Sequence, residues 1–259
     1  MFKLLSSIPF GRLLAALLTL AVVAAPLPAS AATARKIAYI TRLQMPEDAT
    51  ARLKELQQKG LDSDARVKAH MESRGYQVTL LDQSVTPKNL AGYDLVLLSS
   101  VVQSRTMADT PLRDLALPLV TWENDLFDSL RLTGRTKDKE YGEVEKEHYI
   151  RIINAPHPLA GGLAAGKTSA FPRDTSMGWG VPARSAIVVA TMQGDPDKAF
   201  VFGYEKGATM DYDFIAPARR VGLFLDNYSF EQLTPMGLAL FDAAVDWAAD
   251  APPQPASKR

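Results

Sequence analysis

A short and almost uninterrupted apolar run constrains the fold of this chain more than any other feature of the sequence. Residues 94–99 read Asp-Leu-Val-Leu-Leu-Ser, so both alternating faces of an extended segment are apolar there. Strands of this kind lie inside parallel sheets that are covered by helices on both faces. We therefore expect an α/β fold with residues 94–99 as a central strand.

The neighbouring segments of the first half extend this pattern. Strands are predicted at residues 36–41, 77–81 and 117–122, and a helix over residues 62–74 that ends at Gly75. A short helix or turn is expected after the last of these strands. An order of strand, helix and further strands is the usual beginning of an open sheet with parallel strands.

The second half of the chain predicts an antiparallel extension of that sheet. Its expected strands are residues 149–153, 186–190, 199–204 and 221–225. Turn residues at 193–197 predict a hairpin between the second and third of them. A closing helix is expected from Thr234 as N-cap and Pro235 in the first turn to Ala248.

The first 31 residues have the three parts of a secretory signal peptide. Lys3 and Arg12 precede an apolar run at residues 13–25, and small residues lead to a cleavage position after Ala31. The run is shorter than the ~20 apolar residues that cross a bilayer, and an uncleaved signal anchor is the alternative. No cysteine follows the run to carry a lipid. We expect a periplasmic or secreted bacterial protein with no stable membrane anchor after cleavage.

The remaining chain is expected to form a single domain over residues 32–250, followed by a disordered, proline-rich tail at residues 251–259. Lysine plus arginine and aspartate plus glutamate both number 29. Because Lys3 and Arg12 leave with the signal peptide, the mature chain has a slight excess of acids. Such a chain has no basic field for a nucleic acid backbone, so no nucleic acid partner is expected.

Three stretches resemble the class I glutamine amidotransferase-like superfamily, in particular ThuA-like domains and related secreted bacterial domains. They are Tyr-Asp-Leu-Val-Leu-Leu at residues 93–98, His-Pro-Leu-Ala-Gly-Gly-Leu at residues 157–163, and the segment at residues 219–248. The resemblance implies a flavodoxin-like three-layer α/β/α sandwich with a mostly parallel sheet. It also implies a ligand crevice at the carboxyl ends of the strands.

The resemblance does not carry the activity of that superfamily. Amidotransferases use a cysteine nucleophile on a sharp turn after a central strand, and this chain of 259 residues contains no cysteine. The turn after the predicted strand at residues 117–122 also lacks the flanking glycines of a strained nucleophile turn. ThuA-like proteins often place a histidine after the late strand, where this chain has Asp226 and Asn227. Amide hydrolysis by the amidotransferase mechanism is therefore excluded.

An acidic cluster follows the predicted strand at residues 117–122. Glu123, Asn124 and Asp125 stand beside Trp122, with Asp128 shortly after. In an open α/β sheet, this position is where ligands bind. Carboxylates and an amide there can hold a hard cation or sugar hydroxyls, and the indole can stack on a sugar face. The alternative is that the acids simply begin a helix, where capping and the helix dipole favour them.

Three other side chains are candidate contacts of the same site. Glu205 follows the strand at residues 199–204 and is a candidate second acid. Trp179 stands in a glycine- and proline-containing segment, residues 176–182, which is expected to be a loop, and His157 stands between two prolines. Ordinary turn chemistry is the alternative for all three. The charged segment at residues 137–147 is expected to be a solvated excursion or flap.

Three further patterns give weak or negative indications. Residues 161–168 match the letters of a phosphate-binding loop, but neither a strand before them nor a helix after them is expected. A short helix near Leu159 and a strand from Lys167 are expected there instead. The three histidines have no metal-binding spacing. A serine site from Ser99 or Ser100 lacks the usual glycine elbow.

Two functions remain open on the sequence. The first is an exported, non-catalytic domain that binds a small polar ligand, such as a carbohydrate, or a protein partner of the envelope. The second is a hydrolase or isomerase for a sugar or cell-wall fragment, with Glu123, Asp125 and Glu205 as acid/base candidates. In both, Trp122, Asn124, His157 and Trp179 are the candidate ligand contacts. No organic cofactor is expected, and the sequence leaves the question of a metal open.

Overall fold

The computed structural model describes residues 34–250. The signal peptide expected over residues 1–31 and the tail expected over residues 251–259 lie outside the described residues. Within residues 34–250, no helix is both long enough and apolar enough to cross a membrane.

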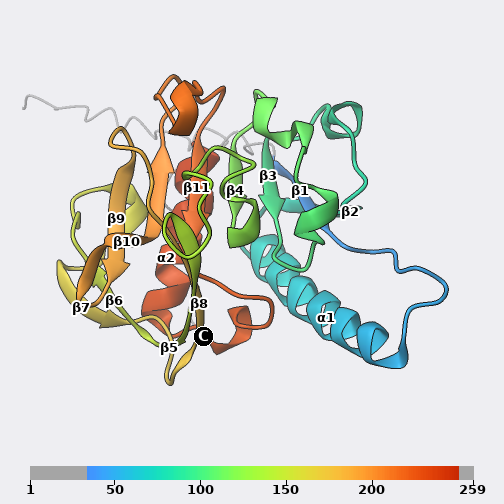
Figure 1. Cartoon of the computed structure of the whole chain (residues 1–259), viewed down its shortest axis with the longest axis horizontal. Coiled ribbons are helices and arrows are strands. Elements are labelled where there is room, and N and C mark those ends of the chain that lie inside the picture. Colours follow the sequence, from blue (N-terminus) through green and yellow to red (C-terminus); the bar gives the residue numbers. More distant parts are fainter. Residues whose placement is uncertain (1–33, 251–259) are drawn as a thin grey trace, which may run out of the picture. The chain divides into compact units, whose positions relative to one another are not determined.

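Five parallel strands form one part of an 11-stranded sheet (Figure 1). In chain order they are β1 (Lys36–Thr41), β2 (Gln77–Asp82), β3 (Leu95–Leu98), β4 (Leu119–Thr121) and β11 (Arg220–Leu223). They lie side by side in the order β2-β1-β3-β4-β11, which is the flavodoxin-like strand order. All four residues of β3 are buried, as the apolar run at residues 94–99 predicts.

The sheet continues beyond β11 with antiparallel strands. They are β10 (Asp195–Tyr204), β9 (Ile187–Met192), β6 (Tyr149–Ile152) and β7 (Gly166–Ser169), in that spatial order. The predicted hairpin is confirmed, because β9 pairs antiparallel with β10 and Gly194 at the turn has φ 93°. The expected fold class, a mostly parallel α/β sheet with an antiparallel extension, is therefore confirmed.

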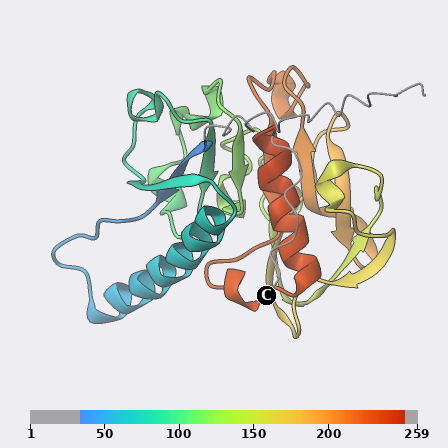
Figure 2. The ribbon, with the colours of Figure 1, turned by 180° about the vertical axis from the view of Figure 1, so that it is seen from behind.

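The two α-helices pack on the same face of the sheet (Figure 2). They are α1 (Ala51–Ser73) and α2 (Pro235–Ala248). Met71 of α1 and Phe241 of α2 belong to one hydrophobic cluster with the alternate strand residues Tyr39 and Leu97. Thr234 caps α2 as predicted, with its side chain accepting a hydrogen bond from the Gly237 amide.

The opposite face of the sheet is covered by short 3-10 helices. Ile40 and Leu98, whose side chains point to this face, pack with Leu112 of η3 (Pro111–Asp114) and Leu126 of η4 (Asn124–Leu126). The connections before β3 and β4 contain Pro87, Pro111 and Pro118, and prolines disfavour a full α-helix there. The third layer of the sandwich is therefore built of short turns rather than of long helices.

Two segments expected as loops form strands instead. β5 (Tyr141–Glu147) pairs antiparallel with β8 (Thr175–Gly180) over the segments expected as a flap and as a glycine-rich loop. The glycines of β8 belong to close packing rather than to a turn. A Cβ at Gly178 would lie 3.0 Å from the Asn124 amide nitrogen, and one at Gly180 would lie 2.8 Å from a Thr133 methyl carbon.

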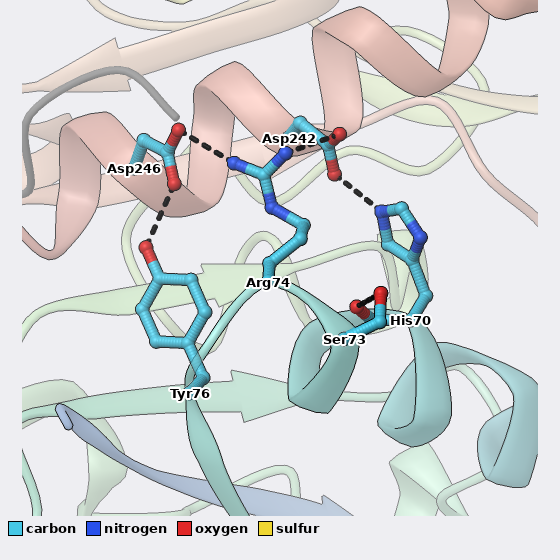
Figure 3. Close-up of polar contacts among 6 residues, drawn as sticks. All are labelled: His70, Ser73, Arg74, Tyr76, Asp242 and Asp246. Atoms are coloured by element: carbon cyan, nitrogen blue, oxygen red, sulfur yellow. Dashed lines mark hydrogen bonds and ion pairs between the residues drawn. The ribbon is translucent and has the colours of Figure 1, made fainter. Parts of the chain in front are cut away.

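A buried ionic network joins α1 to α2 (Figure 3). The guanidinium of Arg74, which is 5% exposed, donates to Asp242 at 2.6 Å and to Asp246 at 2.7 Å. A ring nitrogen of His70 lies 2.6 Å from Asp242, and the Tyr76 hydroxyl donates to Asp246 at 2.7 Å. Each carboxylate of α2 therefore has two partners from the segment that ends α1.

Removal of the Arg74 guanidinium tests this network. In Arg74→Ala, the carboxylates of Asp242 and Asp246 keep their buried positions but lose their cation, so we expect a loss of about 3–5 kcal/mol in the free energy of unfolding. Urea denaturation measures it. The control is Arg66→Ala, which breaks an exposed pair with Glu231 and should cost less than about 1 kcal/mol. Equal losses in the two variants would contradict the assignment.

Candidate functional site

The parallel strands bring a polar cavity together at their carboxyl ends. Ser100 follows β3, Glu123 follows β4 and Asp226 follows β11, and all three line a cavity of about 200 Å³. Glu143 of β5 closes the cavity from the β5–β8 pair. Asn124, Asp125, Asn227 and Ser104 complete its polar lining. This is the edge of an open α/β sheet at which ligands bind.

Glu123 has both of the roles that the sequence allowed. It is the N-cap of η4, because its carboxylate accepts a hydrogen bond from the Asp125 amide at 3.1 Å. It also lines the cavity although it is only 8% exposed. Burial raises the pKa of Glu123 well above its ordinary value, and the charges of Asp125, Glu143 and Asp226 raise it further.

Asn124 and Glu143 hold each other across the cavity. The Asn124 amide donates to Glu143 at 3.0 Å, and the Ser176 hydroxyl donates to the other oxygen of Glu143 at 3.3 Å. Sequence reasoning missed Glu143 because its segment was expected to be a solvated flap. One signal in the sequence favours a strand here, because glutamates alternate with Gly142, Val144 and Lys146.

Asp125 and Asp226 occupy the two sides of the cavity. Asp125 is half-buried and forms an ion pair with the more exposed Lys137 at 2.7 Å. Asp226 is half-buried, and burial raises its pKa, with the charge of Glu143 adding to the effect. The two acids therefore differ in environment, because Lys137 forms an ion pair with Asp125 and not with Asp226.

The two candidate tryptophans, Trp122 and Trp179, are buried in the core and are not exposed to a ligand. Trp122 borders the cavity, but it is 3% exposed and its ring packs against Tyr39 and Phe241, with centroid distances of 5.8 Å to each. Trp179 is also 3% exposed, and it lies in β8 with the Lys198 ammonium over its ring at 4.6 Å. The structure therefore does not bring Trp179 into the cavity.

Glu205 and His157 lie at the opposite edge of the sheet. They follow β10 and β6, which run antiparallel to β11, so their loops leave where the parallel strands begin. Both line a separate cavity of about 840 Å³, in which Glu205 accepts from Arg219 at 2.8 Å. The ring of His157 meets the edge of Trp247 with centroids 5.7 Å apart, and burial lowers the pKa of His157. The predicted site residues therefore fall into two separate groups, and Trp179 belongs to neither.

The other patterns of the sequence resolve as structural features. The short helix and strand expected around Leu159 and Lys167 are confirmed as η5 (Pro158–Ala160) and β7, with Gly161 in the left-handed region at φ 60°. Ser99 donates to Asp64 at 2.8 Å, and His157 is at the far edge, so no serine triad is assembled. Among residues 34–250, no group of three or more histidine, aspartate or glutamate side chains is arranged to hold a metal ion.

Comparison with known proteins agrees with the fold. No family model matches this chain, and no curated protein matches its sequence. The structure is similar to a putative GMP synthase component from Thermoplasma acidophilum, with a TM-score of 0.52 and 12% identity over 84% of this chain and 95% of that chain. It is also similar to a putative ThuA-like protein from Bacteroides uniformis, with a TM-score of 0.49 and 12% identity over 86% of this chain and 95% of that chain.

The first of these similarities identifies the class of fold. At 12% identity it shows the fold alone, which is an α/β flavodoxin-like sheet of the kind found in the putative GMP synthase component. The fold that the sequence resemblance implies is therefore supported.

The raised pKa of Glu123 predicts how the effect of its replacement on stability depends on pH. Because the folded state holds this proton more tightly than the unfolded state does, wild-type stability falls as pH rises above the ordinary glutamate range. Glu123→Gln keeps an oxygen for the Asp125 amide and removes the charge. We expect it to be more stable than wild type at pH 7, with the difference disappearing near about pH 4.

Thermal unfolding at the two pH values measures this difference. The control is Glu145→Gln, which removes a carboxylate at an exposed position of β5, and the difference between the two pH values in Glu123→Gln should exceed that in the control. A Glu123→Gln variant that is equally destabilised at both pH values would show that burial does not hold the proton.

Proposed function

We propose that this chain is an exported binding domain of amidotransferase-like fold, without amidotransferase activity, whose ligand is a small hydroxyl-rich molecule such as a carbohydrate. The observation that carries the proposal is the polar cavity at the carboxyl ends of β3, β4 and β11. Four carboxylates, two amides and two hydroxyls converge there, and the position is the one where open α/β sheets bind ligands.

The chemistry of the cavity selects hydrogen-bond donors. Carboxylates accept hydrogen bonds and donate none when ionised, and Asn124 and Asn227 supply an acceptor and a donor each. Among the described residues that line the cavity there is no lysine, arginine or histidine, so a phosphate or carboxylate ligand finds no cation there. The volume of about 200 Å³ is below the roughly 300–1,000 Å³ of drug-sized sites, which suits one small polar unit.

Two features of the sequence support the rest of the proposal. The absence of cysteine removes the nucleophile that amidotransferases use. The positive start, the apolar run at residues 13–25 and the small residues before Ala31 support export to the periplasm or exterior. A protein partner of the envelope is the alternative ligand. The small polar cavity favours a small molecule over such a partner.

A ligand screen tests the proposal. Thermal-shift measurements with monosaccharides, amino sugars and cell-wall disaccharides are expected to show stabilisation, because a ligand that binds only the folded state raises the unfolding temperature. Hits are titrated by calorimetry. Glu143→Gln and Asp226→Asn are expected to weaken binding about tenfold or more, which corresponds to about 1.4 kcal/mol.

The matched control is Asp197→Asn, which removes an exposed carboxylate on β10 away from the cavity and should leave the affinity unchanged. A screen with no shift for any sugar rejects the small-ligand form of the proposal. Equal losses in Asp197→Asn and Asp226→Asn would mean that net charge, rather than the cavity, governs binding.

A second candidate function is a hydrolase or isomerase for a sugar or cell-wall fragment. The specific observation in its favour is that burial raises the pKa of both Glu123 and Asp226, as in acid/base sites where carboxyl groups hold protons near neutral pH. Glu205 takes no part in this candidate, because it lies at the opposite edge of the sheet.

Turnover of any sugar that the screen identifies tests the second candidate. If Glu123 is the general acid, Glu123→Gln lowers kcat by about 10²–10⁴-fold with a smaller change in the dissociation constant. Product formation is followed by chromatography, with Asp197→Asn as the control. Unchanged kcat in Glu123→Gln would contradict an acid/base role.

A further inference from the structure

The turn after β3 forms one wall of the candidate site. Ser100, Val102 and Ser104 from this turn line the cavity. The turn has no helix or strand before η2 (Ser104–Thr106), and its own backbone contributes only a long hydrogen bond from the Val102 amide to Ser99 at 3.5 Å. The position of this wall therefore depends on what the turn contacts, which is Gln83 through the Gln103 amide at 2.7 Å and the inner face of α1 through Ser99 and Val101.

Asp64 of α1 is a buried carboxylate that is held by hydroxyl groups. It is 2% exposed, and it accepts hydrogen bonds from Tyr39 and Thr41 of β1 at 2.5 Å each and from Ser99 at 2.8 Å. No lysine, arginine or histidine forms an ion pair with it among residues 34–250. Three hydroxyl donors therefore compensate this buried carboxylate, whereas most buried carboxylates are paired with a cation.

Ser99 passes this contact on to the turn. Its hydroxyl donates to Asp64 and accepts from the Val101 amide at 3.0 Å, while its own amide donates to Ile40 of β1 at 3.0 Å. The hydrogen bond from the Val101 amide to the Ser99 hydroxyl spans Ser100, and the same hydroxyl is held by Asp64. Together these contacts fix the direction in which the backbone carries Ser100 to the cavity.

Gly60 of α1 makes a second contact with the same turn. A Cβ at Gly60 would lie 2.7 Å from one methyl carbon of Val101 and 2.8 Å from the other. Any larger residue forces α1 and the turn apart or forces the valine to rotate. A glycine inside a helix is unfavourable for helix formation, so its use here indicates that the close approach matters.

The hydroxyl of Ser100 is left without a partner by this arrangement. Its oxygen is buried and makes no hydrogen bond with residues 34–250, although Ser100 borders the cavity. A staggered rotation about its Cα–Cβ bond is available to a serine side chain at little cost. A ligand hydroxyl in the cavity gives that oxygen the partner that the protein does not.

We propose that Asp64 and Gly60 are positioning residues for the candidate site, and that they set the turn from which Ser100 meets the ligand. The proposal rests on the proposed function for the role of the cavity, but the geometry of the turn is testable without any ligand. A purely structural role is the alternative, in which Asp64 only fastens α1 to the sheet and its loss leaves the turn unchanged.

The absence of cysteine provides a direct probe of the turn. Ser100→Cys creates the single thiol of the chain, and its rate of alkylation by iodoacetamide reports how accessible position 100 is. In the otherwise wild-type protein the rate is expected to be low, because the oxygen at this position is buried. Adding Asp64→Ala is expected to raise the rate at least about tenfold, since the turn loses its support and opens locally.

The control separates local opening from general instability. Val189→Ala shortens a buried side chain of β9, outside the Ser99–Asp64 contacts, so it weakens the fold without touching the turn. In this control, the rate of thiol alkylation should rise only by the amount that global unfolding produces. Asp64→Asn keeps one acceptor oxygen for a hydroxyl and is expected to give an intermediate rate, which is the conservative rescue.

Gly60→Ala keeps the proposal testable if Asp64→Ala does not fold. It favours the helix but pushes against Val101, so the thiol rate is expected to rise in a protein that remains folded. Rates in Asp64→Ala or Gly60→Ala no higher than in Val189→Ala would overturn the proposal. Because alkylation needs no sugar, this result is independent of the ligand screen, and the two proposals fail separately.

Discussion

The direction in which each strand runs is the constraint on which the rest of this structure depends. β3, β4 and β11 are parallel, so the segments that follow them leave the sheet at one edge and place Ser100, Glu123 and Asp226 around one cavity. β10 runs the other way, so Glu205 leaves at the opposite edge. The candidate site is therefore a consequence of sheet topology before it is a consequence of any side chain.

Helix α1 links this edge to the rest of the fold through two buried ionic groups. Asp64, within the helix, is satisfied by three hydroxyl groups beside the cavity, whereas Arg74, just after its end, is satisfied by two carboxylates of α2 (Figure 3). Breaking either set leaves an uncompensated buried charge or donor, which costs more than the intact set contributes. The position of α1 is thus fixed at two points, to β1 and the turn after β3 through Asp64 and to α2 through Arg74.

The sequence predicts the buried strands and the acidic cluster after β4. It does not predict the elements whose position depends on pairing between segments that are far apart in the chain. The apolar run at residues 94–99 and the Thr234 cap each act locally, and both predictions are confirmed. The contribution of Glu143 was missed because β5 is a polar strand whose partner, β8, is far along the chain. The start of α1 at Ala51 was missed because its first turns are charged and mostly exposed, so little burial marks an inner face there.

The two interpretations of Glu123, helix cap and functional acid, are compatible in this structure. The Asp125 amide holds one carboxylate oxygen of Glu123 and so fixes the side chain in one orientation. Fixing it there keeps a buried carboxyl group, whose pKa is raised, at the wall of the cavity. A site gains from groups whose rotamers are already set before the ligand arrives, because less conformational entropy is lost on binding. Capping is therefore a means by which this chain prepares its candidate site, and not an alternative to it.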